Sequence, residues 1–246
     1  YPNCLDFSDW PRIDLVQDDK VRIVWQASST HFEDMWPLAQ ALARVHKKYP
    51  HTEIILFGHP YEWLTKMLDQ DRLTTIPWTS SYAVYMLRMN TLNADINLAP
   101  LHQSEFNETR SAIRAYEAAA CTKPAATLAE RVGSFKAEIQ EGETGRLFTG
   151  AEEFEQKLCE MIEDRTKTRE MGENMKDWVR TYRDPHVHAP VLLEEYQKLR
   201  DGRRAVTAPP APIPEEPELA TVPAELADIR SSKDPSRVKG RTRKHK

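Results

Sequence analysis

The residues with the clearest potential for chemistry lie between positions 105 and 124. If this segment is helical from about Arg110 onward, Arg110, Arg114, Glu117 and Cys121 fall on one line along the helix surface. That line places two guanidinium groups and a carboxylate beside each other, near a helix N-terminus that favours phosphate. Arginine can bind phosphate oxygens, and a carboxylate can accept hydrogen bonds from the two hydroxyls of a ribose. The alternative is an ordinary surface pair between an arginine and a glutamate three or four residues apart.

Two short apolar runs flank this segment and must position it. We expect strands over residues 94–99 and 124–128, with a polar loop and a helix between them. The helix should begin near Arg110 or Ser111. Two preceding residues are its candidate N-caps, Asn107 and Thr109. Because ligands of open α/β sheets bind at the carboxyl ends of strands, the start of this helix is the expected site.

The rest of the chain alternates between strands and helices. Further strands are expected in the apolar runs at residues 21–26, 53–57 and 73–77. Helices are expected over residues 32–48, 61–69, 80–92, 152–163, 166–182 and 189–200. Thr30 is the candidate cap of the first of these helices, with Glu33 at the capping-box position. The alternation predicts an α/β fold with a Rossmann-like, doubly wound parallel sheet, C-terminal helices and a disordered tail.

Composition excludes several classes of function. The chain has 246 residues, of which 40% are hydrophobic, and no apolar run approaches the ~18 residues that span a membrane. The cysteines, Cys4, Cys121 and Cys159, lack the spacing of disulfide or metal sites, which favours a reducing cytoplasm. His186 and His188 have a spacing that can bind metal, but no Cys or carboxylate cluster accompanies them, so no metal site is expected.

Charge is unevenly distributed along the chain. Eight basic residues and one acidic residue between Arg230 and Lys246 give that end a net charge of +7. Because the whole chain has a net charge of −4, residues 1–229 carry a net charge of −11. Such an acidic body offers no broad basic surface, and specific nucleic-acid binding is not expected. Residues 205–246 are proline-rich and then basic, which predicts a disordered tail. The basic end could touch an anionic surface such as a membrane, and a purely solvated tail is the alternative.

Several segments, in order along the chain, resemble GT-B glycosyltransferases of the family-4 type. Three short matches are similar to the helix of that family's donor site: Arg110-Ser111, Tyr116-Glu117-Ala118 and Thr122-Lys123-Pro124. Residues 131–139 and 141–148 are similar to two segments that follow it, the second being a turn and a strand. The resemblance covers roughly residues 1–200 and implies the C-terminal, donor-binding half of such an enzyme.

The resemblance implies a chain of three parts. Residues 1–20, which begin with Pro2-Asn3-Cys4 after one tyrosine, resemble the linker between the two halves, although Cys4 replaces the usual glycine; an ordinary arm is the alternative. Residues 21–204 would form the nucleotide-sugar-binding domain and residues 205–246 the tail. The implied activity is hexose transfer from a nucleotide-diphosphate sugar to an unknown acceptor, with retained configuration and without a metal or other cofactor. The N-terminal half would lie upstream of this chain, and the last helix would cross back towards it.

The resemblance also implies site residues. Glu117 resembles the glutamate that binds the ribose, and Arg110 is the candidate phosphate partner. Further donor-binding candidates come from the same loop and from the loop after the first strand: Ser111, Thr109, Ser29, Thr30 and His31. No catalytic residue is assigned in this half, and neither the sugar nor the base is identified.

The chain departs from the family pattern at positions that matter for phosphate binding. Thr109 stands where the first glutamate of the family's pair is expected. The first loop carries Ala27-Ser28 and Glu33-Asp34 in place of Gly-Arg and Lys-Gly, so the usual cations are missing. A non-catalytic binding module that kept the fold and lost donor chemistry is therefore the alternative. A flavodoxin-like or response-regulator domain fits the order of elements but not the turn at residues 142–148.

Overall fold

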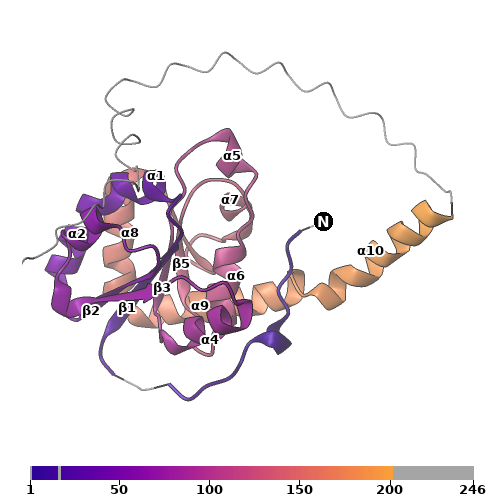
Figure 1. Ribbon diagram of the computed structural model, residues 1–246, viewed down its shortest axis with the longest axis horizontal. Helices are drawn as coiled ribbons and strands as arrows, with labels where there is room; N and C mark the ends of the chain where they lie inside the picture. The colour runs from indigo at the N-terminus through magenta and orange to yellow at the C-terminus, as the bar shows by residue number, and fades with distance from the viewer. Residues whose placement is uncertain (1, 16–17, 202–246) are drawn as a thin grey trace, which may run out of the picture. The chain divides into compact units, whose positions relative to one another are not determined.

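Six parallel strands form the centre of the protein. The computed structural model describes residues 2–15 and 18–201, and Figure 1 shows their arrangement. The strands are β1 (Val21–Ala27), β2 (Thr52–Gly58), β3 (Leu73–Pro77), β4 (Ile96–Ala99), β5 (Ala126–Glu130) and β6 (Gly145–Phe148). Their order in the sheet is β3-β2-β1-β4-β5-β6, which is the Rossmann order and not the flavodoxin-like one. The predicted doubly wound parallel sheet is therefore confirmed.

Helices cover both faces of the sheet (Figure 1). One face carries α1 (Phe32–Met35), α2 (Ala39–Lys48) and α8 (Gly150–Glu163). The other carries α4 (Tyr82–Thr91) and α6 (Ile113–Ala120), while α9 (Arg165–Tyr182) contributes to the cores on both faces. The remaining helices are α3 (Glu62–Thr65), α5 (Glu105–Glu108), α7 (Phe135–Glu138) and α10 (Pro185–Arg200). Short 3-10 turns lie at η1 (Phe7–Asp9), η2 (Trp36–Leu38) and η3 (Gln70–Arg72).

The central strands are buried on both faces because their side chains alternate between two apolar cores. In β1, Ile23 and Trp25 pack into the core with α2 and α8, while Val24 between them packs into the core with α4 and α6. All three are at most 1% exposed. A continuous apolar run is what a parallel strand covered by helices on both sides requires, and this explains why the run could be recognised in the sequence.

The single helix predicted over residues 32–48 is wrong. The chain forms α1, then the turn η2, then α2. Pro37 lies in the turn and has no backbone N–H to give to the preceding turn, so regular α-helical hydrogen bonding is interrupted there. The predicted cap at Thr30 is also wrong, because His31 occupies the N-cap position and makes no side-chain capping bond.

The predicted start of the helix near Arg110 is wrong as well. The carbonyl of Arg110 accepts a hydrogen bond from the Ser134 amide at 3.3 Å instead of from a residue one turn later, and α6 begins only at Ile113. Neither Asn107 nor Thr109 caps it, since Ala112 holds the N-cap position without a side-chain bond. Arg110 therefore lies in the loop between α5 and α6, outside the helical line predicted for it.

Two other helices differ from prediction for local reasons. Helix α3 is shorter than predicted because the side chain of Gln70 ends it. The side-chain amide of Gln70 donates to the backbone carbonyls of Thr65, at 2.6 Å, and Leu68, at 2.9 Å. Helix α10 begins earlier than predicted because the Asp184 carboxylate accepts from the His186 amide at 2.8 Å and Pro185 occupies the first helical position.

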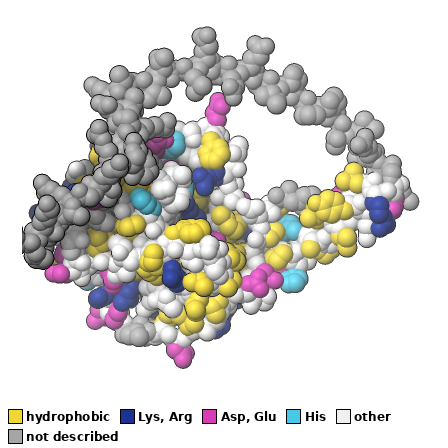
Figure 2. Space-filling view, viewed as in Figure 1, with side chains coloured by type: hydrophobic (Ala, Val, Ile, Leu, Met, Phe, Trp, Pro, Cys, Tyr) yellow, Lys and Arg dark blue, Asp and Glu magenta, His cyan; other side chains and the backbone are white. Residues whose placement is uncertain are grey.

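Helix α10 keeps none of its residues buried. Figure 2 shows hydrophobic side chains along its length. The large apolar residues that are more than half exposed are Val187, Val191, Leu193, Tyr196 and Leu199. Among the helices of the described residues, none is both long and apolar enough to cross a membrane. The predicted tail, residues 205–246, lies outside the part of the chain that the structure describes.

The N-terminal arm packs on the domain through residues 2–15. Leu5 and Trp10 are buried, and the Leu5 amide donates to the carbonyl of Arg183 at 2.8 Å. The Asn3 side chain donates to the Ser111 hydroxyl at 2.7 Å. The segment expected to be a linker is therefore tied both to the end of α9 and to the loop that carries the predicted site residues.

Candidate functional site

The site lies where the strand order reverses, between β1 and β4. These two strands are parallel neighbours, with Trp25 paired to Leu98 near their carboxyl ends. The loop after β1, residues 28–31, and the segment between β4 and α6, residues 100–112, which includes α5, therefore emerge at the same edge of the sheet. Such a switch point is where open α/β sheets form ligand-binding crevices.

A contact between an arginine and a histidine joins the two sides of the switch point. Nη2 of Arg114, in the first turn of α6, lies 2.7 Å from Nε2 of His31. The other ring nitrogen of His31, Nδ1, lies 2.6 Å from Oδ2 of Asp34. Arginine can only donate hydrogen bonds, so Nε2 of His31 must accept and Nδ1–H must donate to Asp34. This arrangement makes His31 neutral and fixes its tautomer.

The Asp34 carboxylate holds the loop after β4 in addition to His31. Its Oδ1 accepts from the His102 amide at 2.9 Å and from Nδ1 of His102 at 3.0 Å. Burial alone would raise the pKa of Asp34, but the hydrogen bonds from His31 and His102 outweigh it, and the pKa lies below its ordinary value. Asp34 is therefore an ionised anchor buried beneath the two loops.

Arg114 is a deeply placed cation. Its Nη1 is buried and has no hydrogen-bond partner among the described residues. Burial lowers the pKa of its guanidinium and the nearby Arg110 lowers it further, against the opposing effects of Tyr85, Asp34 and Glu117. A guanidinium remains charged despite such a shift. The site therefore holds a positive charge with one donor nitrogen unused.

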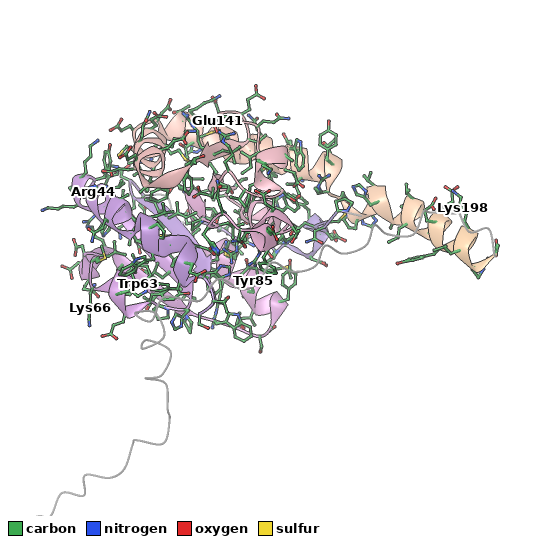
Figure 3. All side chains as sticks on the ribbon, turned by 90° about the horizontal axis from the view of Figure 1, so that it is seen from above. Arg44, Trp63, Lys66, Tyr85, Glu141 and Lys198 are labelled. Carbon is green, nitrogen blue, oxygen red and sulfur yellow. The ribbon has the colours of Figure 1, made fainter. Side chains whose placement is uncertain are left out.

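Glu117, one turn further along α6, is held by Tyr85 on α4, which is labelled in Figure 3. The Tyr85 hydroxyl lies 2.7 Å from Oε2 of Glu117 and 2.6 Å from Oε1 of Gln26 at the end of β1. Burial raises the pKa of Glu117, although the bond from Tyr85 and the charge of Arg114 oppose this. Burial also raises the pKa of Tyr85. A carboxylate, a phenol and an amide thus share one polar cluster beside Arg114.

A hollow of about 210 Å³ opens at the start of α6. It is lined by Leu101, Arg110, Ser111, Ile113, Arg114 and Phe135. A second hollow of about 290 Å³ lies next to it under the N-terminal arm. It is lined by Pro2, Asn3, Thr109, Ser111, Tyr116, Ser134 and Glu138. No acidic side chain lines the first hollow, so its charged groups are two guanidiniums.

The predicted site residues are only partly brought together. Arg110 and Ser111 line the first hollow, but Arg110 is also stacked over the Phe106 ring at 5.5 Å. Thr109 lines only the second hollow and donates its hydroxyl to the Phe106 carbonyl at 2.8 Å. Glu117 lines neither hollow, and its carboxylate accepts a hydrogen bond from Tyr85.

The candidates from the loop after β1 differ in burial. Ser29 and Thr30 are exposed and line neither hollow. The Thr30 hydroxyl instead lies 2.8 Å from that of Ser28. His31, by contrast, is only 5% exposed and contacts Arg114. Only one of the three predicted residues of this loop therefore reaches the centre of the site.

Sequence reasoning missed the residues that organise this centre. Arg114 was placed on the line with Glu117 but was not chosen as a ligand-binding residue. Asp34 stands at the position of the glycine in the family's Lys-Gly pair and is not among the predicted site residues, and neither are His102 and Tyr85. Arg114, His102 and Tyr85 contact residues that lie far away in the sequence. Two local signals could have pointed to this cluster, namely the spacing of Arg114 and Glu117 along α6 and that of His31 and Asp34, three residues apart.

No group of three or more metal-binding side chains occurs in the described part of the chain. His188 instead lies with Nε2 at 2.9 Å from the Tyr182 carbonyl, and Nε2 of His186 lies 3.7 Å from a carboxylate oxygen of Asp6.

Comparison with known proteins gives matches in structure. No protein-family model matches the chain, and no curated protein matches its sequence. Sucrose-phosphate synthase from Thermosynechococcus elongatus matches with a TM-score of 0.61 at 15% identity, over 82% of this chain and 52% of that one. The C-terminal domain of LpcC, a glycosyl transferase group 1 family protein from Francisella tularensis, matches with a TM-score of 0.55 at 18% identity, over 73% of this chain and 98% of that one.

A third match is HepE from Anabaena, crystallised in complex with UDP-glucose. It has a TM-score of 0.57 at 18% identity, over 73% of this chain and 49% of that chain. The chain thus spans about half the length of the longer proteins that it matches, and nearly the whole of the LpcC domain. At this identity the likeness establishes the fold alone, which the chain shares with the C-terminal domain of LpcC and with about half of each longer protein.

Proposed function

We propose that this chain is the donor-binding half of a glycosyltransferase that transfers a hexose from a nucleoside diphosphate to an acceptor. The observation that carries the proposal is the hollow at the start of α6, which two guanidiniums and the Ser111 hydroxyl line at the switch point of the sheet. The matched HepE structure, which holds UDP-glucose, supports a nucleotide sugar as the donor.

The proposed chemistry requires fixed positive charge where the leaving diphosphate develops its negative charge. Arg110 and Ser111 can donate to phosphate oxygens from the loop, and the start of α6 adds backbone N–H groups with the positive end of the helix dipole. The arginine side chains would thus stabilise the negative charge of the diphosphate, as a metal ion does in other enzymes, and we propose that no metal is needed. Retention of configuration at the sugar is part of the same proposal.

Glu117 is proposed to bind the ribose. One of its oxygens, Oε2, already accepts from Tyr85, and a carboxylate has lone pairs for further donors. The ribose hydroxyls are such donors. Burial strengthens a hydrogen bond to a charged group, so this contact would contribute about 1.5–3 kcal/mol to binding.

The acceptor site is proposed to lie in a second domain that completes the enzyme. The chain spans about half the length of the whole proteins it matches. Helix α10 exposes five large apolar residues and buries none, which supports a role in contacting that second domain. This chain by itself should then bind a donor without transferring the sugar efficiently.

A non-catalytic binding module is the second candidate, and one observation favours it. The positions at which the resembled family carries Gly-Arg and Lys-Gly hold Ala27-Ser28 and Glu33-Asp34. Ser28 and Glu33 thus stand where that family has its arginine and lysine, and the neighbouring Asp34 adds a buried negative charge that three hydrogen-bond donors hold. A module of this kind would keep the fold and bind neither diphosphate nor sugar donor.

Titration calorimetry with UDP, GDP and ADP separates the two candidates. We expect one of these nucleotides to bind the 246-residue chain and, more tightly, a protein in which the second domain is present. Hydrolysis or transfer from the matching nucleotide sugar should require that second domain. If no nucleotide binds in either context, the transferase proposal fails and the binding-module reading takes its place.

A further inference from the structure

Nη1 of Arg114 is a buried donor without a hydrogen-bond partner among the described residues. Of the guanidinium nitrogens, Nη2 contacts His31 at 2.7 Å, while Nη1 is buried without a partner among the described residues. Of the ion pairs formed within residues 2–15 and 18–201, none includes Arg114. A buried charged donor without an acceptor is strongly unfavourable, so an acceptor is the missing component.

His31 positions Arg114 without neutralising it. Because Nδ1–H of His31 donates to Asp34, its Nε2 can offer only a lone pair to Nη2 of Arg114. The negative charge of Asp34 is one residue further away and is already shared among His31 and His102. The guanidinium is thus held in a fixed orientation and keeps its net charge.

The surroundings of Arg114 suit an anion with several acceptor oxygens. The hollow that Arg114 lines also exposes Arg110 and Ser111 and carries no Asp or Glu. Arg114 belongs to the first turn of α6, which has eight residues and whose N-cap, Ala112, supplies no side-chain acceptor. At about 210 Å³ the hollow is far larger than the roughly 30 Å³ of a single water molecule.

We propose that Arg114, positioned by His31, is the principal cation that binds the diphosphate of the ligand, in place of the cations that the loop after β1 lacks. The nucleoside part of that ligand rests on the function proposed above; the diphosphate part rests on the buried nitrogen and the hollow. Arg110, which is stacked on Phe106 at the surface, has the smaller role.

The test uses the 246-residue chain and two probes, inorganic pyrophosphate and UDP, in titration calorimetry. Arg114→Gln removes the charge and keeps hydrogen-bonding groups, and we expect it to weaken both probes about tenfold to a hundredfold. Arg110→Gln should weaken them less. Arg44→Gln is the matched control, because Arg44 points outward from α2 and pairs with Glu155 at the surface (Figure 3), and it should change nothing.

Three further variants keep the test decisive if Arg114→Gln does not fold. Arg114→Lys retains the charge but loses the planar fork, so binding should be intermediate. His31→Gln can still accept a hydrogen bond from Arg114, whereas His31→Leu cannot, so only the leucine variant should weaken pyrophosphate. Unchanged pyrophosphate binding in His31→Leu, with an unchanged melting temperature, would remove His31 from the proposal.

The outcomes distinguish this inference from the proposed function. If UDP binds the wild type and the Arg114 variants equally well, Arg114 is not the phosphate ligand, although the donor site stands. If pyrophosphate binds in an Arg114-dependent way and no nucleoside diphosphate binds more tightly than it, the nucleotide-sugar proposal fails and the anion site stands. Failure of pyrophosphate to bind the wild type overturns the inference.

Discussion

The Tyr85 hydroxyl lies 2.7 Å from Oε2 of Glu117 and so ties α4 to α6 beside the candidate site. The same hydroxyl lies 2.6 Å from Oε1 of Gln26, but a phenol has only one proton to donate. When Glu117 is ionised, Tyr85 donates that proton in a hydrogen bond to the carboxylate. When Glu117 is protonated, it can donate to Tyr85 while Tyr85 donates to Gln26. Burial raises the pKa of Glu117, and the bond from Tyr85 opposes that rise.

Glu117→Gln should weaken nucleoside binding with little change in fold. The substitution keeps the shape of the side chain but removes the charge that makes its hydrogen bonds to ribose strong. We expect the affinity for uridine and for UDP to fall by the same factor, about tenfold to a hundredfold. Calorimetry with both ligands measures this, and an unchanged uridine affinity would show that Glu117 does not bind the ribose.

Nucleoside binding should also weaken as the pH falls. Burial raises the pKa of Glu117, so its carboxylate takes up a proton at a higher pH than an exposed glutamate does. Because the bond from Tyr85 lowers that pKa, Tyr85→Phe should move the midpoint of the loss of binding to still higher pH. Uridine titrations of the wild type and Tyr85→Phe over the acid range check the sign, and a shift to lower pH would contradict it.

Arg110→Ala should discriminate between the phosphate and nucleoside parts of the ligand. Arg110 lines the hollow at the start of α6 and has no contact with Glu117 or Tyr85. We therefore expect UDP binding to weaken by up to about tenfold while uridine binding is unchanged. A parallel loss for both ligands in calorimetry would mean that the substitution disturbs the whole loop.

Glu130→Gln should stabilise the protein at neutral and alkaline pH. Burial, together with the neighbouring Glu153 and Asp34, raises the pKa of Glu130 to about 7, against the opposing hydrogen bond from the Gly150 amide. A raised folded-state pKa contributes stability that is present below the unfolded value of about 4.5 and is lost as the pH rises through about 7. Thermal melts of both proteins should therefore coincide below that unfolded value and diverge above about pH 7, with the variant melting higher. Equal melting temperatures throughout would show that Glu130 is not destabilised by its charge.

Gly133→Ala should push the loop after β5 away from the backbone of the segment that carries Arg110. Gly133 has φ +57, and a Cβ there would lie 2.6 Å from the Asn107 carbonyl and 3.1 Å from that of Arg110. Gly142 is the matched control, since its φ is +75 but a Cβ there would meet nothing within 4 Å. Gly142→Ala should cost only the backbone strain, about 1 kcal/mol. Gly133→Ala should cost about 1–3 kcal/mol more and weaken UDP binding, as measured by denaturant unfolding and calorimetry.

The architecture could be predicted from the pattern of side chains along the chain. Apolar runs such as that of β1 must be buried on both faces, and their alternation with amphipathic segments allows little other than a parallel α/β sheet. Strand β3 lies at its predicted bounds, residues 73–77. These features could be predicted because they depend on side chains two to four residues apart, which the sequence displays directly.

The centre of the site, by contrast, depends on contacts between segments that are distant in the sequence. Arg114 meets His31, 83 residues away, because β1 and β4 are neighbours in the sheet, and no local pattern encodes that adjacency. The start of α6 was likewise decided at a distance, since the Ser134 amide takes the Arg110 carbonyl and moves that arginine out of the helix. The pairing of a buried guanidinium with a neutral histidine follows from where separate loops come to lie, because hydrogen bonds and burial act through space and not along the chain.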